Sequence, residues 1–285
     1  MPEPVDPFKI RAHVPNFEAS VVDYQASSVS TRARLRARLD LAYGEGPAEK
    51  VDLFFPESAT AAGPLPVHMF VHGGYWRANS KSDYSYVADS IVGQGAIAAI
   101  IEYSLMPGAR MGNLVDQVRR AAIWLGSRAS DFGGDPNAIS ASGHSAGAHL
   151  VTYLACRAPH ESELPSNRVR SILPISGIYD LAPIARSFLQ PEIHLIAEEI
   201  AHWSPCDAIP RPGTFVQLVV GSLETAPFHE QVERFGRRLS AFGLSPRLST
   251  IAGEDHMTIV RSLGRPQTEC SDYLGETIAA SRSRQ

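Results

Sequence analysis

The chain has 285 residues, of which 44% are hydrophobic and 20% charged, and its formal net charge is −4. This composition is that of a folded globular protein, long enough to bury a large core. Acidic and basic residues are mixed along the chain, and this mild, scattered charge argues against a strongly basic surface for nucleic acid or anionic membranes.

The N-terminal stretch and the apolar runs give no indication of export or membrane insertion. The first residues, MPEPVDPFKIRAHVPNF, are polar and interrupted by proline, without the apolar region of a secretory signal. The longest apolar run, at residues 96–101, is far too short to span a bilayer. We therefore expect a cytoplasmic protein with neither a membrane nor a nucleic acid as partner.

Cysteine and histidine spacing predicts neither disulfides nor a metal site. The three cysteines lie far apart without a CxxC pattern, at Cys156, Cys206 and Cys270. So sparse and odd a number favours reduced, buried thiols in a cytoplasm. The histidines form no HExxH pattern or other ligand spacing. The sequence therefore predicts no metal and no other cofactor.

In chain order, the first distinctive segment is a basic run at residues 31–38, which we interpret as the solvated face of a helix. Two apolar segments follow, at residues 50–56 and 66–72. They flank an alanine- and proline-rich link at residues 57–66, and we expect them to pair as hairpin-like strands.

Strands and helices alternate through the rest of the chain. A polar helical stretch at residues 81–92 leads into an apolar strand at 96–104, whose continuous apolar run indicates burial on both faces. The next helix is expected to begin with Asn113 and Asp116 as a capping pair. Its buried stripe is predicted to comprise Leu114, Val118, Ala121, Ala122 and Leu125. The remaining expected elements are strands at 138–143, 169–177, 214–222 and 246–253, and helices at 145–158, about 227–242 and from about 258 onward.

This alternation predicts an α/β fold with a mostly parallel central sheet and helices on both faces. The interval from Leu181 to Gly213 breaks the alternation with a helix at residues 191–203 and a proline-rich return. It is too long for an ordinary connection, and we interpret it as a small cap over one end of the sheet. Without an evident linker, residues 1–285 are expected to form one domain with a cap-like insertion at about 181–213.

The segment SASGHSAGAHL contains a GxSxG pattern centred on Ser145. An apolar strand precedes it and an amphipathic helix follows, which is the context in which such a serine sits on a strained turn with its hydroxyl exposed. A helix-capping serine between two turn glycines is the alternative, and the strand–turn–helix context disfavours it. The pattern predicts Ser145 as a nucleophile.

A serine hydroxyl needs a base to accept its proton. His256 follows the last predicted strand in a polar turn and is the expected base. His149 lies one helical turn after Ser145 and is expected to pack, and His144 is too close in the chain to reach back to the hydroxyl. His72 precedes the two glycines of HGGYW and is expected to support that loop.

The base needs an acid to orient it, and that acid should follow the penultimate strand. Glu224 stands three residues after Gly221, where that strand is expected to end. Glu254 and Asp255 adjoin His256 in the chain and remain alternatives, although they are awkwardly placed to meet its Nδ1 atom. The chain order of nucleophile, acid and histidine is that of the α/β-hydrolase sheet.

Acyl transfer also needs hydrogen-bond donors for the oxygen that becomes negative. The backbone N–H of Ala146, next after the serine, is one candidate. Further donors require an early strand-to-helix loop whose backbone can approach a substrate closely, and the glycines of HGGYW at residues 72–76 suit this purpose. A tight turn with two aromatic side chains packed on the core is the alternative reading of that segment.

The motifs HGGYW and GHSAGAH together resemble those of the kynurenine formamidase (arylformamidase) branch of α/β-hydrolases, related to HGGG-type esterases. The lead-in LDLAYGEGPAEKVDLFFP, the acid loop VVGSLETAPFHEQ and the histidine loop GEDHMTIV are similar to those of the family, so that the resemblance covers about residues 35–275. The family usually has an aspartate where Glu224 stands.

The resemblance implies an α/β-hydrolase fold with Ser145 as nucleophile, His256 as base and Glu224 as orienting acid. It also implies an oxyanion hole formed by Gly74, Tyr75 and Ala146, with Gly73 giving the loop its bend. An aromatic-friendly substrate pocket could be built from Trp76, His144, His202, Trp203 and Phe228, in addition to Tyr75.

These residues predict a cofactor-independent serine hydrolase that cleaves a small ester or an N-acyl or N-formyl aryl amide through an acyl-enzyme. A short-chain carboxylesterase without an amidase role is the alternative within enzymes. A hydrolase-fold protein that binds a small molecule without cleaving it is a third hypothesis, disfavoured because the triad residues are all present. The expected partner is a small-molecule ester or amide, and the oligomeric state is left open, a homodimer included.

Overall fold

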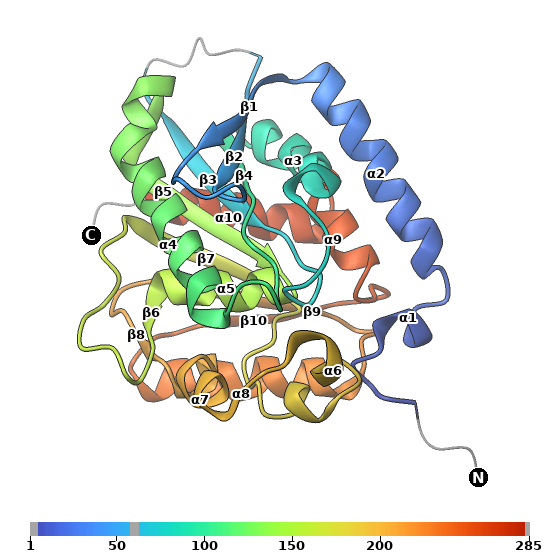
Figure 1. Ribbon diagram of the computed structural model, residues 1–285. Helices are drawn as coiled ribbons and strands as arrows, with labels where there is room; N and C mark the ends of the chain where they lie inside the picture. The colour runs from blue at the N-terminus through green and yellow to red at the C-terminus, as the bar shows by residue number, and fades with distance from the viewer. Residues whose placement is uncertain (1–4, 58–62, 283–285) are drawn as a thin grey trace.

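The computed structural model describes residues 5–57 and 63–282, and within them an eight-stranded sheet forms the centre of the molecule (Figure 1). The predicted link at residues 57–66 falls largely outside this part of the chain. The strand order is β1-β2-β4-β3-β5-β7-β9-β10. In chain order the strands are β1 (Arg36–Ala42), β2 (Lys50–Phe55), β3 (Leu65–Val71), β4 (Ile97–Ile101), β5 (Gly134–His144), β7 (Val169–Ile175), β9 (Phe215–Gly221) and β10 (Arg247–Ile251).

The sheet is parallel from β4 to β10 and antiparallel at the β1–β2 edge. The expected mostly parallel sheet is therefore present. The expected pairing of the first two apolar segments is wrong, because β4 lies between β2 and β3 and pairs with both. β2 and β3 are therefore not neighbours in the sheet, and adjacency in the chain did not become adjacency in the sheet.

Helices cover both faces of the sheet (Figure 1). These helices are α3 (Ala88–Gly93), α4 (Met111–Arg128), α5 (Ala146–Ala155), α8 (Ala226–Ala241), α9 (Thr258–Leu263) and α10 (Glu269–Arg282), with 3₁₀ turns η1 (Lys81–Val87) and η2 (Ala129–Phe132). On one face, α10 packs against β5 and β7 and also contacts α3 and α9. On the other face, α5 packs against the same two strands and α4 lies beside it, while α8 contacts β9 and β10.

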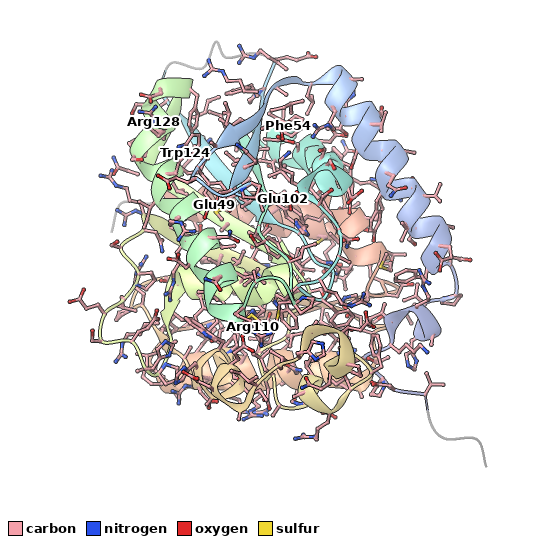
Figure 2. The ribbon with its side chains drawn as sticks, in the orientation of Figure 1. Glu49, Phe54, Glu102, Arg110, Trp124 and Arg128 are labelled. Atoms are coloured by element: carbon pink, nitrogen blue, oxygen red, sulfur yellow. The ribbon has the colours of Figure 1, made fainter. Side chains whose placement is uncertain are left out.

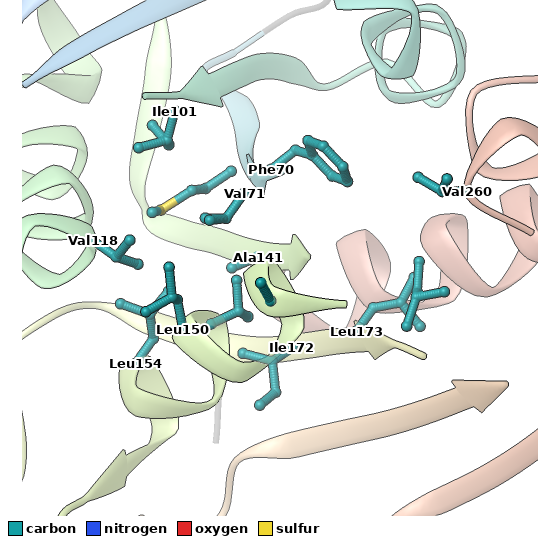
Figure 3. Close-up of a cluster of buried hydrophobic side chains, with 14 of the residues drawn as sticks. Phe70, Val71, Ile101, Val118, Ala141, Leu150, Leu154, Ile172, Leu173 and Val260 are labelled. Carbon is teal, nitrogen blue, oxygen red and sulfur yellow. The ribbon is translucent and has the colours of Figure 1, made fainter. Parts of the chain in front are cut away.

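The apolar core lies between the sheet and these helices. In Figure 3, Val118 of α4 and Leu150 and Leu154 of α5 face the strands from one side, and Val260 of α9 lies toward the other. Phe70, Ala141 and Ile172 of the central strands are fully buried. Because helices cover both faces, these strands are apolar along their length rather than alternating.

The N-terminal part of the chain consists of α1 (Ile10–His13), α2 (Phe17–Arg34) and β1. The basic run at residues 31–38 is not one solvated helix face, because α2 ends at Arg34 and β1 begins at Arg36. Arg32 forms an ion pair of 2.5 Å with the buried Asp52, and the guanidinium of Arg36 lies over the ring of Phe55. The helix therefore ends within the basic run, and Arg32 and Arg36 of this run have tertiary partners.

Several expected helices have different boundaries in the structure, among them the following three. α4 begins at Met111, and Asn113 accepts a hydrogen bond from the Arg110 N–H instead of preceding the first turn. The C-terminal helical segment is interrupted between α9 and α10. The expected helix at 191–203 divides at His194, whose φ is 51°.

The segment proposed as a cap, about residues 181–213, forms short helices and one short strand. Arg110, at the start of α4, pairs with the carboxylate of Glu199 in this segment, and Figure 2 shows Arg110 at the boundary between the two regions. The elements are η3 (Ile184–Arg186), α6 (Gln190–Ile193), α7 (Ala197–His202), η4 (Pro205–Asp207) and β8 (Ile209–Pro210), which pairs with β6 (Cys156–Arg157).

All three cysteines are buried and none forms a disulfide. Burial raises the pKa of Cys156 and of Cys206 to about 12, so that both thiols stay protonated at neutral pH. Within residues 5–57 and 63–282, no helix combines the length and apolar character needed to cross a bilayer.

Candidate active site

Ser145 lies on the sharp turn between β5 and α5. Its φ and ψ are 56° and −118°, a conformation that is strained for a residue with a Cβ atom. The Ser145 N–H donates to the carbonyl of Ile175 on the neighbouring strand, which fixes the turn to the end of the sheet. The turn therefore presents the serine side chain at the carboxyl edge of the parallel strands.

The glycines on either side of Ser145 are required by close backbone packing. A Cβ atom on Gly143 would overlap the carbonyl of Gly147, and a Cβ on Gly147 would overlap the carbonyl oxygen of Val71 in β3. The GxSxG pattern thus allows α5 to start directly against the neighbouring strand.

Replacing Gly147 with alanine is expected to destabilise the protein by about 3 kcal/mol, because β3 and α5 must separate to admit the methyl group. Urea unfolding monitored by circular dichroism measures this loss. Gly93→Ala is the matched control, since a Cβ on this exposed helical glycine meets no atom within 4 Å. Equal stability of the two variants would contradict the packing argument.

His256 and Glu224 form a buried hydrogen-bonded pair. The Nδ1 atom of His256 lies 2.6 Å from Oε2 of Glu224. Because a carboxylate only accepts, Nδ1 carries the hydrogen and Nε2 is left as the atom that can accept a proton. Glu224 Oε1 in turn accepts hydrogen bonds from the Gly221 N–H at 2.9 Å and from the Ser176 hydroxyl. Both carboxylate oxygens are therefore held in place.

The two alternative acids have other partners. Asp255 accepts hydrogen bonds from the backbone N–H groups of Met257 and Thr258, each at 2.8 Å, at the start of α9. Glu254 accepts a hydrogen bond from the Ser262 hydroxyl. Of the three acids, only Glu224 has a hydrogen bond with His256 in the described part of the chain.

The loop after β3 adopts a left-handed backbone over three consecutive residues, with φ of 121° at Gly74, 51° at Tyr75 and 59° at Trp76. A Cβ on Gly73 would lie 3.2 Å from the Cβ of Ser145, so this glycine lets the loop pass directly beside the serine. His72 supports the loop, as expected, because its Nδ1 donates to the Gly73 carbonyl at 2.8 Å.

Backbone N–H groups lie near the serine without acceptors. Within the described residues, no hydrogen bond is found for the N–H of Gly74 or of Tyr75. The N–H of Ala146 belongs to the first turn of α5, where N–H groups have no partner in the helix. A cluster of unpaired donors of this kind can stabilise an oxyanion.

A cavity of about 640 Å³ opens beside Ser145 and His256. Ser145, His256, His144, Gly74 and Tyr75 all line it. The remaining lining residues come from the N-terminal segment, from the loop and turn after β3, from the segment at 181–213 and from the start of α9: Lys9, Ile10, Arg11, Phe17, Val21, Tyr24, Gln25, Arg77, Ala78, Asn79, Asp83, Tyr84, Phe188, Glu192 and Met257.

The N-terminal segment forms part of the cavity wall, which no motif in the sequence indicates. It is fixed by hydrogen bonds to three separate regions. Tyr75 donates through its hydroxyl to the Phe8 carbonyl at 2.5 Å, the Phe188 N–H donates to Asp6 at 2.6 Å, and Tyr24 donates to the Met257 carbonyl. Burial, and then the charges of Asp6 and Glu224, raise the pKa of Tyr75, so its hydroxyl remains a donor.

The expected pocket residues fall into two groups. His144 lines the cavity, whereas Phe228 does not line it but contacts the His256 ring at 4.5 Å between centroids. Trp76 is fully buried and donates to His149 at 3.3 Å, so it packs instead of facing the cavity. His202 and Trp203 do not line the cavity either. The His202 ring stacks on His160, and the Trp203 ring lies edge-to-face with Tyr153.

No cluster of three or more histidine, cysteine, aspartate or glutamate side chains in the described ranges is arranged to hold a metal ion. The site consists instead of a strained serine, a carboxylate–imidazole pair and unpaired backbone donors. This arrangement can activate a hydroxyl and stabilise negative charge on an acyl oxygen.

Comparison with known proteins places these features in a family. The BD-FAE family model matches residues 51–216, which is more than half of the chain. Kynurenine formamidase of Danio rerio is 28% identical over 259 residues, covering 89% of this chain and 84% of that protein. The esterase LipC of Mycobacterium tuberculosis is 32% identical over 141 residues, covering 48% of this chain and 35% of that protein.

Among solved structures, a candidate thioesterase from Silicibacter sp. TM1040 superposes with a TM-score of 0.81 at 29% identity, covering 97% of this chain and 99% of that one. These relatives, together with the sheet and its helices, establish the fold expected from the sequence, and they show a hydrolase of ester or amide bonds. The chain belongs to the BD-FAE family and is an arylformamidase-like α/β-hydrolase related to esterases.

Proposed function

We propose that this protein is a cofactor-independent serine hydrolase that cleaves a small ester or an N-acyl or N-formyl aryl amide through an acyl-enzyme. The observation that carries the proposal is the hydrogen bond between His256 and the fully held carboxylate of Glu224, in the same cavity as Ser145 on its strained turn. A nucleophile, a base and an orienting acid need this relation to act together.

In the proposed first step, the Ser145 hydroxyl attacks the carbonyl carbon of the substrate while His256 accepts its proton at Nε2. Glu224 stabilises the imidazolium that forms. The N–H groups of Gly74, Tyr75 and Ala146 donate to the oxygen that becomes negative, with Gly73 allowing the loop its close approach.

To complete acylation, His256 gives the proton to the leaving alcohol or amine, and the acyl group remains on Ser145. A water molecule then attacks the acyl carbonyl, and His256 accepts one of its protons. Transfer of that proton back to Ser145 releases the acid and restores the enzyme.

Cavity size and lining support a small aromatic substrate. A volume of about 640 Å³ lies within the range of pockets that enclose small molecules. Phe17, Tyr24, Tyr84 and Phe188 contribute aromatic surface to its wall. We propose that residues 181–213 act as a cap within a single catalytic domain, since Phe188 and Glu192 of this segment line the cavity.

Wild-type enzyme is expected to hydrolyse N-formylkynurenine with a kcat/KM at least as high as that for p-nitrophenyl acetate. Parallel steady-state assays with both compounds measure the ratio. p-Nitrophenyl butyrate and acetanilide extend the series toward longer acyl groups and toward other anilides. Negligible formamidase activity beside rapid ester turnover would contradict the formamidase assignment.

That outcome would favour the second candidate, a short-chain carboxylesterase without an amidase role. The similarity to the esterase LipC supports this candidate. The same residues serve both reactions, and the difference lies in protonation of a poorer leaving group by His256.

A further inference from the structure

His144, the residue before Ser145, is buried without a well-formed hydrogen bond. It is 2% exposed, and neither Nδ1 nor Nε2 makes a hydrogen bond of good geometry among the described residues, although the backbone of His256 lies close to the ring. Buried polar atoms without partners destabilise a protein, so a leucine or methionine would fill this space more favourably. A property of the imidazole ring other than its hydrogen-bonding capacity must therefore be considered.

The His144 ring lies against the ring of His256. The two ring centroids are 4.6 Å apart, with an angle of 47° between the ring planes. On its other side, His144 adjoins the loop after β3, because its Nδ1 would lie 3.1 Å from a Cβ on Gly73. His144 thus fills the space between this loop and the His256 ring.

Phe228, on α8, makes a second contact of the same kind. Its ring centroid lies 4.5 Å from that of His256, with an interplanar angle of 46°. Phe228 is 1% exposed and is packed in turn against Phe8 of the N-terminal segment. Two buried aromatic rings from separate elements therefore contact His256, while Glu224 binds its Nδ1.

Extending the proposed function, we propose that His144 and Phe228 form an aromatic pair that positions the His256 ring and stabilises its protonated form during acyl transfer. The faces of aromatic rings attract a cation when it lies within about 6 Å of the ring centroid. Both distances fall within this range. In the terms of the mechanism, His144 and Phe228 are positioning residues that act through His256.

His144 suits this position because it remains neutral. Burial, and then the charge of His256, lower the pKa of His144 well below its usual value, and a weak hydrogen bond with the backbone of His256 only partly opposes this shift. When His256 accepts the proton of Ser145, His144 consequently adds no second positive charge beside it.

Three carboxylates lie close to His256 in space or in the chain. Glu224 faces it from the β9–α8 connection, and Asp255 and Glu254 on its own segment have the partners described above. The remaining groups on the cavity wall are Lys9, Arg11, Tyr24, Tyr75, Arg77, Asp83, Tyr84 and Glu192, of which Arg77 and Glu192 pair with each other at 2.8 Å.

The test measures the rate constant for phosphonylation of Ser145 by a fluorophosphonate as a function of pH. This probe needs no knowledge of the natural substrate. If the wild-type enzyme does not react, the proposed function fails at the nucleophile. If it reacts but the variants below behave like it, only the aromatic pair fails.

His144→Leu and Phe228→Leu are each expected to lower the plateau rate constant about tenfold. Each ring is proposed to favour the protonated imidazole of His256, so without one ring the rise of the rate with pH is expected to move toward acid by about half to one unit. His144→Phe keeps a ring but has no ring nitrogens, and its plateau and midpoint should stay close to those of the wild-type enzyme.

His202→Leu is the matched control, because it removes an imidazole stacked on His160 at 4.1 Å, away from the cavity. Wild-type profiles for both leucine variants would overturn the proposal. A slower rate with an unchanged midpoint would overturn the stabilisation of the protonated ring, since that result indicates ring misplacement alone. Equal impairment of His144→Phe and His144→Leu would overturn the role of the His144 ring, because the effect would then belong to its nitrogens. Should one leucine variant fail to fold, the other still decides, because the two rings come from separate elements.

Discussion

Ser145→Ala is expected to reduce kcat/KM by about 10⁶-fold on any substrate that the wild-type enzyme cleaves. The variant loses the atom that is proposed to form the acyl-enzyme, whereas the backbone of the turn is expected to stay unchanged. Alanine keeps the Cβ atom and therefore the same strain at φ 56° and ψ −118°. The free energy of unfolding should stay within about 0.5 kcal/mol of the wild-type value.

Stopped assays at high enzyme concentration, together with labelling by a fluorophosphonate, measure this effect. Ser127→Ala, at an exposed serine of α4, is the control and should keep full activity. Substantial turnover or labelling in the Ser145→Ala variant would assign the nucleophile elsewhere. Complete inertness of the wild-type enzyme would instead revive the hypothesis of a hydrolase-fold binding protein.

Glu224→Gln is expected to lower kcat/KM by up to about 10⁴-fold. The carboxylate accepts a hydrogen bond from Nδ1 of His256 at 2.6 Å, and this leaves Nε2 free to accept the serine proton. A glutamine amide can donate to Nδ1 instead, which favours the tautomer with the hydrogen on Nε2. It also removes the negative charge that stabilises the imidazolium. Steady-state kinetics at saturating and at low substrate concentration separate kcat from KM.

Two further variants identify the acid. Glu254→Gln should retain most of the activity, because Glu254 binds Ser262 and not His256. Glu224→Asp should recover part of the loss by restoring the charge, although the shorter side chain must give up some contact with Gly221 or with His256. A near-wild-type Glu224→Gln enzyme would transfer the role to Glu254 or Asp255.

The length of Glu224 has a structural explanation. Its carboxylate spans from the end of β9, where the Gly221 N–H donates to Oε1, to the His256 ring, which contacts Oε2. Ser176, whose φ is 51°, adds a hydroxyl donor from the end of β7. Ser176 was not singled out in the sequence, because a lone serine after a strand carries no motif.

Several features were predictable because they depend on residues close together in the chain. The GxSxG segment specifies a strand, a tight turn and a helix within about ten residues. The apolar strands indicate a sheet covered on both faces. Glu224 and His256 could be selected because each follows a strand, and the carboxyl ends of parallel strands meet at one edge of the sheet.

Other features depend on contacts between distant segments. The pairing of β2 with β4 could not be read from the chain, because an apolar run does not identify its neighbour. The expected pocket residues Trp76, His202 and Trp203 are aromatic, but contacts with His149, His160 and Tyr153 keep their side chains away from the cavity.

The sequence by itself determined the fold class, the GHSAG turn and the order of serine, acid and histidine, since local backbone preferences and strand patterns specify these. Tertiary structure alone decided which rings contact His256, how both oxygens of Glu224 are held and that α1 and α2 help to enclose the cavity. These contacts join residues up to more than two hundred positions apart, such as Tyr24 and Met257. Their formation depends on the packing of whole elements, which no local pattern encodes.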